Sequence, residues 1–232
     1  MNDIGTKKQE YEQLVKVLFH DIKNPLSSLI GYLGLIKRCI PEEKKQYVTN
    51  CLWSAKELSR LCENIEDTIE LENNKIQLSL GKYKLKEIFE KILKRLEPES
   101  NYFKKEIVLE IPENIDFVNV DLNLIEKVMY SIIYHCLQNI RAGQKVEVVV
   151  KQDSNYTTVE IKDEGQPLSE EDLPDYFDKF FVVNAIKGKR RGRGLNFYFC
   201  KLIIELHKGK LILNRVDNKN IFSVSLLTFN TL

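Results

Sequence analysis

The sequence of 232 residues predicts an α-helical hairpin followed by an α+β two-layer sandwich. Over the first 75 residues, apolar side chains recur at steps of three and four, which is the period of amphipathic helices. After about residue 76, short alternating segments interleave with shorter helical ones. We therefore expect a hairpin domain over residues 1–75 and a second domain over residues 76–232.

The hairpin consists of two long predicted helices separated by Pro41. The first, from about residue 8 to 40, has its apolar stripe at Leu14, Leu18, Ile22, Leu26, Leu29, Leu33 and Ile36. The second continues to about residue 73, after a turn in which Glu42 and Glu43 suit a helix N-terminus. Two stripes of this length are too large to bury against each other alone, so we expect a second copy to complete a four-helix bundle in a homodimer.

The second domain is expected to hold one mixed sheet under a layer of helices. The predicted helices cover residues 84–96, 122–140, 170–181 and 195–207, with Pro98 ending the first of them and a loop over 182–193. The predicted strands cover residues 106–111, 117–120, 146–151, 157–163, 210–215 and 221–227. The helix over 122–140 is mostly apolar, which indicates that it is buried.

Composition excludes several classes of protein. A net charge of +1 gives no global reason for binding nucleic acid or a membrane surface. Five widely spaced cysteines without a C-x-x-C pair argue against a disulfide framework or a zinc site and suit a reducing cytoplasm. The N-terminus is polar, and no apolar run reaches the ~18 residues of a membrane span. We therefore expect a cytoplasmic protein.

The segment FHDIKNPL contains the first candidate site. His20 stands beside Asp21, and Asn24 follows one helical turn later on the same face. An exposed imidazole beside a carboxylate can act as a nucleophile. The alternative from these residues alone is an ordinary surface histidine on a helical hairpin.

Two glycine-bearing turns form the second candidate site. Asp163 ends a predicted strand and can accept a hydrogen bond from an exocyclic amine such as that of adenine, while Gly165 allows a flat ring to approach the backbone. Gly192 and Gly194 precede a predicted helix, whose exposed backbone donors suit phosphate. Strand-to-helix loops often carry glycine, so neither turn alone defines a site.

Taken in order, these segments resemble the catalytic core of sensor histidine kinases: a dimerisation and histidine-phosphotransfer hairpin followed by an ATP-binding domain of the GHKL, or Bergerat, fold. FHDIKNPLSSLIGYL is similar to the H box, DEGQPLSEEDLPDYFDKFF to the first glycine box and phenylalanine box, and GRGLNFYFCKLIIELHKGKL to the second glycine box. The resemblance covers nearly the whole chain. It implies that His20 accepts phosphate, that Asp21 orients it and takes its proton, and that Asn24 orients a water during receiver dephosphorylation.

The asparagine box departs from the family pattern. Its two asparagines, which help to hold magnesium, are replaced here by Ser131 and His135. A hydroxyl is a weaker ligand, and imidazole is a poor ligand for a cation that prefers oxygen, so no metal ligand is certain. His135 can instead hydrogen-bond a phosphate or fill a remodelled pocket. Basic side chains before and within the second glycine box either contact phosphates or form a solvated loop: Lys187, Lys189, Arg190, Arg191 and Arg193.

The resemblance implies a two-component histidine kinase that autophosphorylates His20 from ATP and passes the phosphoryl group to a response-regulator aspartate. The implied cofactor is ATP with Mg²⁺, and the implied partners are a second copy and a receiver domain. Because the sequence shows no membrane span, we also expect a separate upstream sensor or kinase to supply the input signal. The altered asparagine box leaves open a degenerate member that acts as a histidine phosphotransferase, a receiver phosphatase or a non-enzymatic scaffold.

Overall fold

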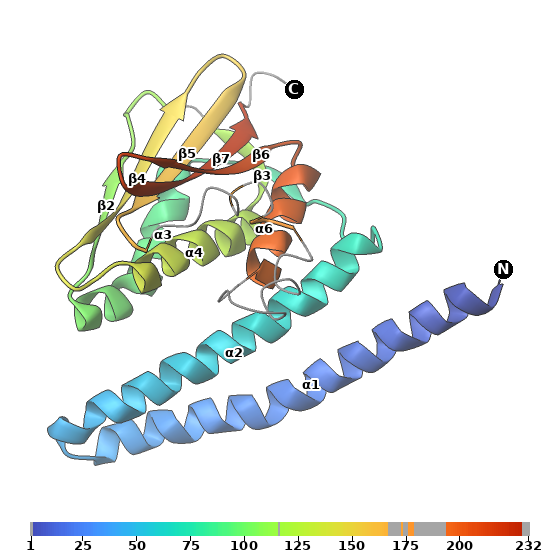
Figure 1. Cartoon of the computed structure of the whole chain (residues 1–232), viewed down its shortest axis with the longest axis vertical. Helices are drawn as coiled ribbons and strands as arrows, with labels where there is room; N and C mark the ends of the chain where they lie inside the picture. The colour runs from blue at the N-terminus through green and yellow to red at the C-terminus, as the bar shows by residue number, and fades with distance from the viewer. Residues whose placement is uncertain (1, 116, 167–172, 174–175, 179–193, 229–232) are drawn as a thin grey trace. The chain divides into compact units, whose positions relative to one another are not determined.

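The computed structural model describes residues 2–115, 117–166, 173, 176–178 and 194–228, which divide into two compact units, Met1–Lys75 and Ile76–Leu232 (Figure 1). The first unit contains α1 (Asn2–Cys39), the short 3-10 helix η1 (Glu42–Lys44) and α2 (Lys45–Glu72). Helices α1 and α2 run antiparallel, which confirms the predicted hairpin.

The turn between the two helices begins at Pro41. Pro41 adopts φ −56° and ψ 149°, an extended conformation that ends α1 and precedes η1. Small and medium side chains of these two helices are buried: Leu26, Thr49, Ala55, Cys62, Asn64, Thr68 and Leu71. An ion pair between Lys23 and Glu66 also joins the two helices.

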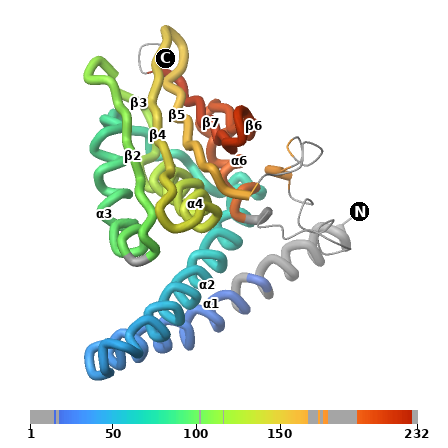
Figure 2. Tube along the Cα trace, turned by 60° about the vertical axis from the view of Figure 1, so that its left-hand side comes forward, coloured from blue at the N-terminus to red at the C-terminus, as the bar shows by residue number. Residues whose placement is uncertain are grey.

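The second unit contains two sheets. A two-stranded antiparallel sheet pairs β1 (Leu80–Tyr83) with β3 (Val118–Asp121). The larger sheet contains β2 (Glu106–Glu110), β4 (Lys145–Gln152), β5 (Tyr156–Asp163), β6 (Lys210–Val216) and β7 (Lys219–Leu227). Its strand order is β2-β4-β5-β7-β6, with β2 parallel to β4 and the other pairs antiparallel (Figure 2).

Three described helices pack on one face of this sheet: α3 (Leu85–Phe103), α4 (Leu122–Asn139) and α6 (Gly194–Leu206) (Figure 1). Helix α4 is buried along most of its length, as its apolar sequence predicted, and contacts both α3 and α6. Strand β5 alternates between buried and half-buried side chains, so one face meets the helices and the other meets solvent. This arrangement is the predicted α+β two-layer sandwich.

The first helix of this unit extends further than the sequence predicted. Pro98 lies inside α3, which continues to Phe103 and ends where Lys104 adopts a left-handed φ of 54°. Pro98 is exposed, so water can satisfy the carbonyl whose partner is lost, while Leu96 and Glu99 are buried on either side of it. The sequence analysis also missed strand β1, which pairs with β3.

Part of the predicted second domain lies outside the described residues. The helix expected over 170–181 is described only at residues 173 and 176–178, which form turns, and the loop expected over 182–193 is not described.

Candidate functional site

The H-box histidine lies on the exposed surface of α1. The His20 side chain is 71% exposed and that of Asp21 69%, and Nδ1 of His20 lies 3.3 Å from Oδ1 of Asp21. When Nδ1 carries the proton and donates it to this carboxylate, Nε2 keeps its lone pair. Asn24 is exposed one turn further along the same helix. The three side chains therefore form one accessible face with a nucleophilic nitrogen.

The backbone beneath this face is tied to the second helix. Lys23, within the same helical turn, pairs with Glu66 of α2, and both side chains are only about a quarter exposed. Leu26 is buried one position beyond Pro25. These contacts fix the rotation of α1 that leaves His20 facing solvent.

Asp163 occupies the end of β5 and is almost completely buried. Its Oδ1 accepts hydrogen bonds from the backbone N–H of Gly165 at 2.7 Å and from Nδ2 of Asn220 at 3.0 Å. Its Oδ2 accepts no hydrogen bond from a nitrogen or oxygen of the described residues, and the Cys136 thiol lies beside the carboxyl group. Burial raises the pKa of this carboxyl above its usual value. One oxygen is thus positioned by the protein, and the other is buried without such a partner.

Gly165 is required by packing against the protein itself. A Cβ there would lie 2.6 Å from Oδ1 of Asp163, 2.8 Å from Cβ of Asn139 and 2.9 Å from the Asn139 carbonyl oxygen. The sequence argument assigned this glycine to the approach of a ligand ring. The structure adds that it lets the turn after β5 pack against the last residue of α4.

The asparagine-box positions of α4 face an aromatic cluster. Nε2 of His135 lies 3.3 Å from the Tyr176 hydroxyl, and its ring stands edge-on to Phe197, with centroids 4.7 Å apart and planes at 87°. The His135 ring is 5.7 Å from that of Phe222 at 77°. The cluster consists of His135, Tyr176, Phe177, Phe197 and Phe222. It joins α4, α6 and β7 through rings that are all buried.

These residues fit a nucleotide base better than they fit a magnesium ion. The buried Oδ2 of Asp163 offers an acceptor for an exocyclic amine. At the asparagine box, by contrast, the donors are the Ser131 hydroxyl and an imidazole enclosed by rings, whereas Mg²⁺ prefers several oxygen ligands in an octahedron. In the described part of the chain, no group of three or more His, Cys, Asp or Glu side chains is arranged to hold a metal. The residues that the structure describes do not fit Mg²⁺.

Of the remaining predicted site residues, the structure describes only Gly194. Gly194 is the first residue of α6, at its N-terminus. Gly192 and the basic side chains fall outside the described residues, and their predicted phosphate contacts stay predictions: Lys187, Lys189, Arg190, Arg191 and Arg193.

The sequence analysis did not identify two partners of Asp163, the amide of Asn220 and the thiol of Cys136. Asn220 lies directly opposite it in the β5–β7 pairing, and its Nδ2 also donates to the Gln166 carbonyl at 3.3 Å. Cys136 follows His135 on α4 and is fully buried, and burial raises the pKa of its thiol well above the usual value. No local signal marks Asn220, because its role depends on a strand pairing between distant segments.

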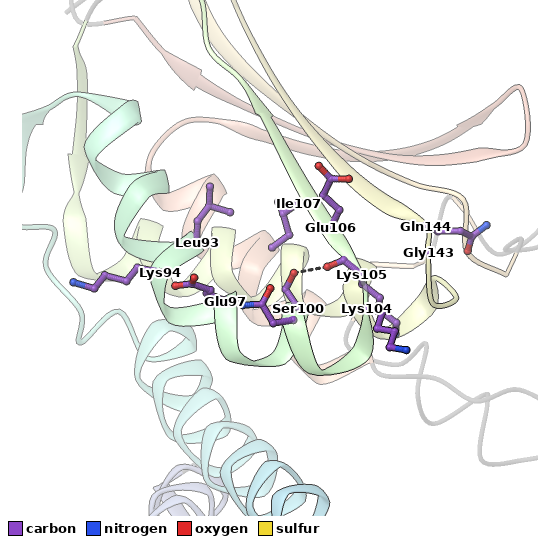
Figure 3. Close-up of a pocket in the computed structure, with 11 residues that line it drawn as sticks. Leu93, Lys94, Glu97, Ser100, Lys104, Lys105, Glu106, Ile107, Gly143 and Gln144 are labelled. Atoms are coloured by element: carbon purple, nitrogen blue, oxygen red, sulfur yellow. Dashed lines mark hydrogen bonds between the residues drawn. The ribbon is translucent and has the colours of Figure 1, made fainter. Parts of the chain in front are cut away.

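A separate cavity of about 520 Å³ lies at the C-terminal end of α3 (Figure 3). Its walls come from α3, the start of β2 and the turn before β4, and include Ser100, Lys105 and Gly143. Lys105 Nζ donates to the Leu137 carbonyl of α4 at 2.6 Å. None of the predicted nucleotide-site residues that the structure describes lines this cavity.

Comparison with known proteins agrees with this arrangement. Residues 10–74 match the family described as His Kinase A (phospho-acceptor) domain, and residues 120–228 match the family described as histidine kinase-, DNA gyrase B-, and HSP90-like ATPase. The sensor protein KdpD of Clostridium acetobutylicum is 31% identical over 204 residues, which is 85% of this chain and 22% of KdpD. The chain thus spans less than two thirds of the length of curated relatives such as KdpD, YvrG and WalK.

Two solved structures have the same fold. The histidine kinase AdeS of Acinetobacter baumannii is 26% identical, with a TM-score of 0.64 over 91% of this chain and 98% of that chain. The histidine kinase ThkA, in a crystal structure with the response regulator protein TrrA, is 18% identical with a TM-score of 0.62, over 98% of this chain and 64% of that chain. The second likeness shows the fold alone.

The fold and the two sites define a phosphoacceptor hairpin joined to a nucleotide-binding ATPase-type domain. The chain belongs to the histidine kinase family and has the catalytic core of a sensor histidine kinase.

Proposed function

We propose that this chain is a protein-histidine kinase of a two-component system, which phosphorylates His20 from ATP and passes the phosphoryl group to a response-regulator aspartate. The observation that carries the proposal is the exposed His20 imidazole with the Asp21 carboxylate 3.3 Å from its Nδ1. The matches to a phosphoacceptor domain and to an ATPase domain, in that order along the chain, support it.

The geometry supports a specific assignment of roles. Nε2 of His20 attacks the γ-phosphorus of ATP, a P–N bond forms, and the bond from that phosphorus to the bridging oxygen breaks to release ADP. Asp21 accepts the Nδ1 proton as the imidazole loses electron density. Asp163, held by Gly165 and Asn220, receives the adenine amine on Oδ2. In the second step, phosphotransfer, the phosphoryl group leaves Nε2 of His20 and bonds to a carboxylate oxygen of the receiver aspartate.

Labelled ATP tests this proposal directly. Wild-type protein should gain an acid-labile label that is absent from His20→Ala. Asp21→Asn should slow labelling by about 10²–10⁴-fold, the range of general acid–base catalysis. Cys51→Ser, an exposed change on α2, is the matched control and should label normally. Label that persists in His20→Ala, or no label on the wild type, refutes the proposal.

A second candidate is a phosphotransfer protein or receiver phosphatase with little kinase activity. The enclosure of His135 in the aromatic cluster favours it, because the phosphate end of the nucleotide site then lacks a family ligand. Asn24, exposed one turn from His20, is in position to orient a water. A phosphorylated receiver should then lose its phosphate faster with wild-type protein than with Asn24→Ala. Equal loss with both, and no label on His20, would exclude this candidate.

We further propose that the functional unit is a homodimer built through the hairpin. Large apolar side chains of α1 remain exposed, and Leu18, Leu29, Tyr32 and Ile36 share one helix face as a stripe. Leu35 of α1 and Leu58 of α2 are exposed as well. A second copy can cover this stripe in a four-helix bundle. Sedimentation equilibrium should give twice the 27.2 kDa chain mass, and Leu35→Glu should weaken the association. A wild-type monomer at micromolar concentration would contradict the proposal.

The remaining partners and the compartment are also proposals. The TrrA complex of ThkA supports a response regulator as the phosphoryl acceptor. All five cysteines are free thiols, which suits a reducing cytoplasm. In the part of the chain that the structure describes, no helix has the length and apolarity needed to cross a membrane. A divalent cation is the one expected component that the described residues do not fit.

A further inference from the structure

The His135 side chain has a structural role that competes with cation binding. Its Nε2 is engaged with the Tyr176 hydroxyl at 3.3 Å, and the ring is only 9% exposed. Phe197 and Phe222 contact it edge-on, with centroids 4.7 and 5.7 Å away. Moving this nitrogen onto a hydrated cation would break the bond to Tyr176 and open the aromatic packing. Each of these changes costs free energy.

The neighbouring groups do not replace the missing ligand. Ser131, one turn before His135 on α4, is 5% exposed. Asp163 holds Gly165 and Asn220 with one oxygen, and its other oxygen lies in a buried, raised-pKa carboxyl beside Cys136. A hydrated Mg²⁺ needs several oxygen ligands at 2.0–2.1 Å. The described residues near α4 do not offer it this set of oxygens.

We propose that adenine nucleotide binding by this domain is independent of divalent cations, because α4 has exchanged a metal-ligand pair for the aromatic cluster pinned by His135. The inference rests on the proposed nucleotide binding at Asp163. A cation that accompanies ATP is then held by phosphate oxygens and water and contributes little to affinity.

Isothermal titration of the full chain with ADP and with ATP, in MgCl₂ and in EDTA, tests the proposal. The two dissociation constants for each nucleotide should agree within about threefold, well below the tenfold that 1.4 kcal/mol represents. Binding more than tenfold tighter in MgCl₂ overturns this inference and leaves the proposed ATP binding intact. If neither nucleotide binds in either buffer, both this inference and the proposed ATP binding are overturned. Asp163→Ala should abolish binding in both buffers.

Two variants examine the cause. Ser131→Asn combined with His135→Asn restores the amide pair and should make ATP binding depend on MgCl₂; a folded double variant that stays indifferent overturns the inference. Tyr176→Phe removes only the hydroxyl and should leave binding independent of MgCl₂, because the rings still enclose the imidazole. A gain of magnesium dependence in Tyr176→Phe would show that the Tyr176 hydrogen bond, and not ring packing alone, keeps the imidazole from the cation, which would support the competition. The wild-type comparison decides the proposal even where the double variant fails to fold.

Discussion

Replacing His207 by alanine should uncouple the end of α6 from the start of α4. The His207 Nδ1–H donates to the Ile203 carbonyl at 2.8 Å, and its Nε2 accepts from the backbone N–H of Asp121 at 3.0 Å. Asp121 in turn caps α4 through the Leu124 N–H at 3.2 Å and accepts the Ser79 N–H at 2.9 Å. The imidazole therefore joins the C-terminal end of α6 to the N-terminal end of α4.

The cost follows from the groups left without partners. Both His207 and Asp121 are 8% exposed, so the Asp121 N–H would lose its acceptor in a buried environment. A buried group left without a hydrogen bond costs about 1–3 kcal/mol. For a folding unit of this size, each kcal/mol lowers the melting temperature by roughly 2–4 °C.

The same histidine makes stability depend on pH. The bond that Nε2 accepts from the Asp121 N–H requires the neutral ring, because a protonated Nε2 cannot accept. Burial lowers the pKa of His207 in the folded protein below its ordinary value of 6.5. The unfolded chain then binds more protons just below pH 6.5, so the free energy of unfolding falls as the pH falls, by up to about 1.4 kcal/mol per pH unit. His207→Ala should lack this contribution.

Urea titrations at pH 7.5 and 5.5, followed by far-UV circular dichroism, measure both effects, while Trp53 fluorescence reports the hairpin unit separately. Leu206→Ala, a neighbouring change at a partly exposed site, is the matched control and should keep the wild-type pH dependence. The reasoning is wrong if His207→Ala costs no more than Leu206→Ala and keeps the same pH dependence.

Three further predictions follow from packing and charge. Phe89→Ala should lower the free energy of unfolding by about 3–5 kcal/mol in urea titrations, because Phe89 is fully buried. Gly165→Ala should cost about 1–3 kcal/mol through the close contacts of its Cβ and should weaken ADP binding by calorimetry; full wild-type stability would refute this. Hydrogen bonds from Lys145 and Lys219 lower the pKa of Glu147 to about 2. The ionised carboxylate should therefore stabilise the fold by about 0.5–1 kcal/mol above pH 4.5, and this contribution should fade toward pH 2. Denaturation as a function of pH should show no such contribution in Glu147→Gln.

The sequence determined the features that depend on neighbouring residues. Helical periodicity and Pro41 predicted the hairpin, and the apolar run of α4 predicted its burial. The order of the H box and the glycine turns predicted the family, which the comparisons confirm. Each of these signals lies within one segment or in the order of segments, so no tertiary contact was needed to read it.

Tertiary structure decided which side chains meet. Asn220 reaches Asp163 only because β5 pairs with β7, more than fifty residues apart. His135 could be assigned from sequence either to a phosphate or to a remodelled pocket, and the structure places it against Phe197 and Phe222. Pro98 read as a helix end, yet α3 continues through it because that side of the helix faces water. Burial and long-range pairing are properties of the folded chain, so local sequence could not fix these outcomes.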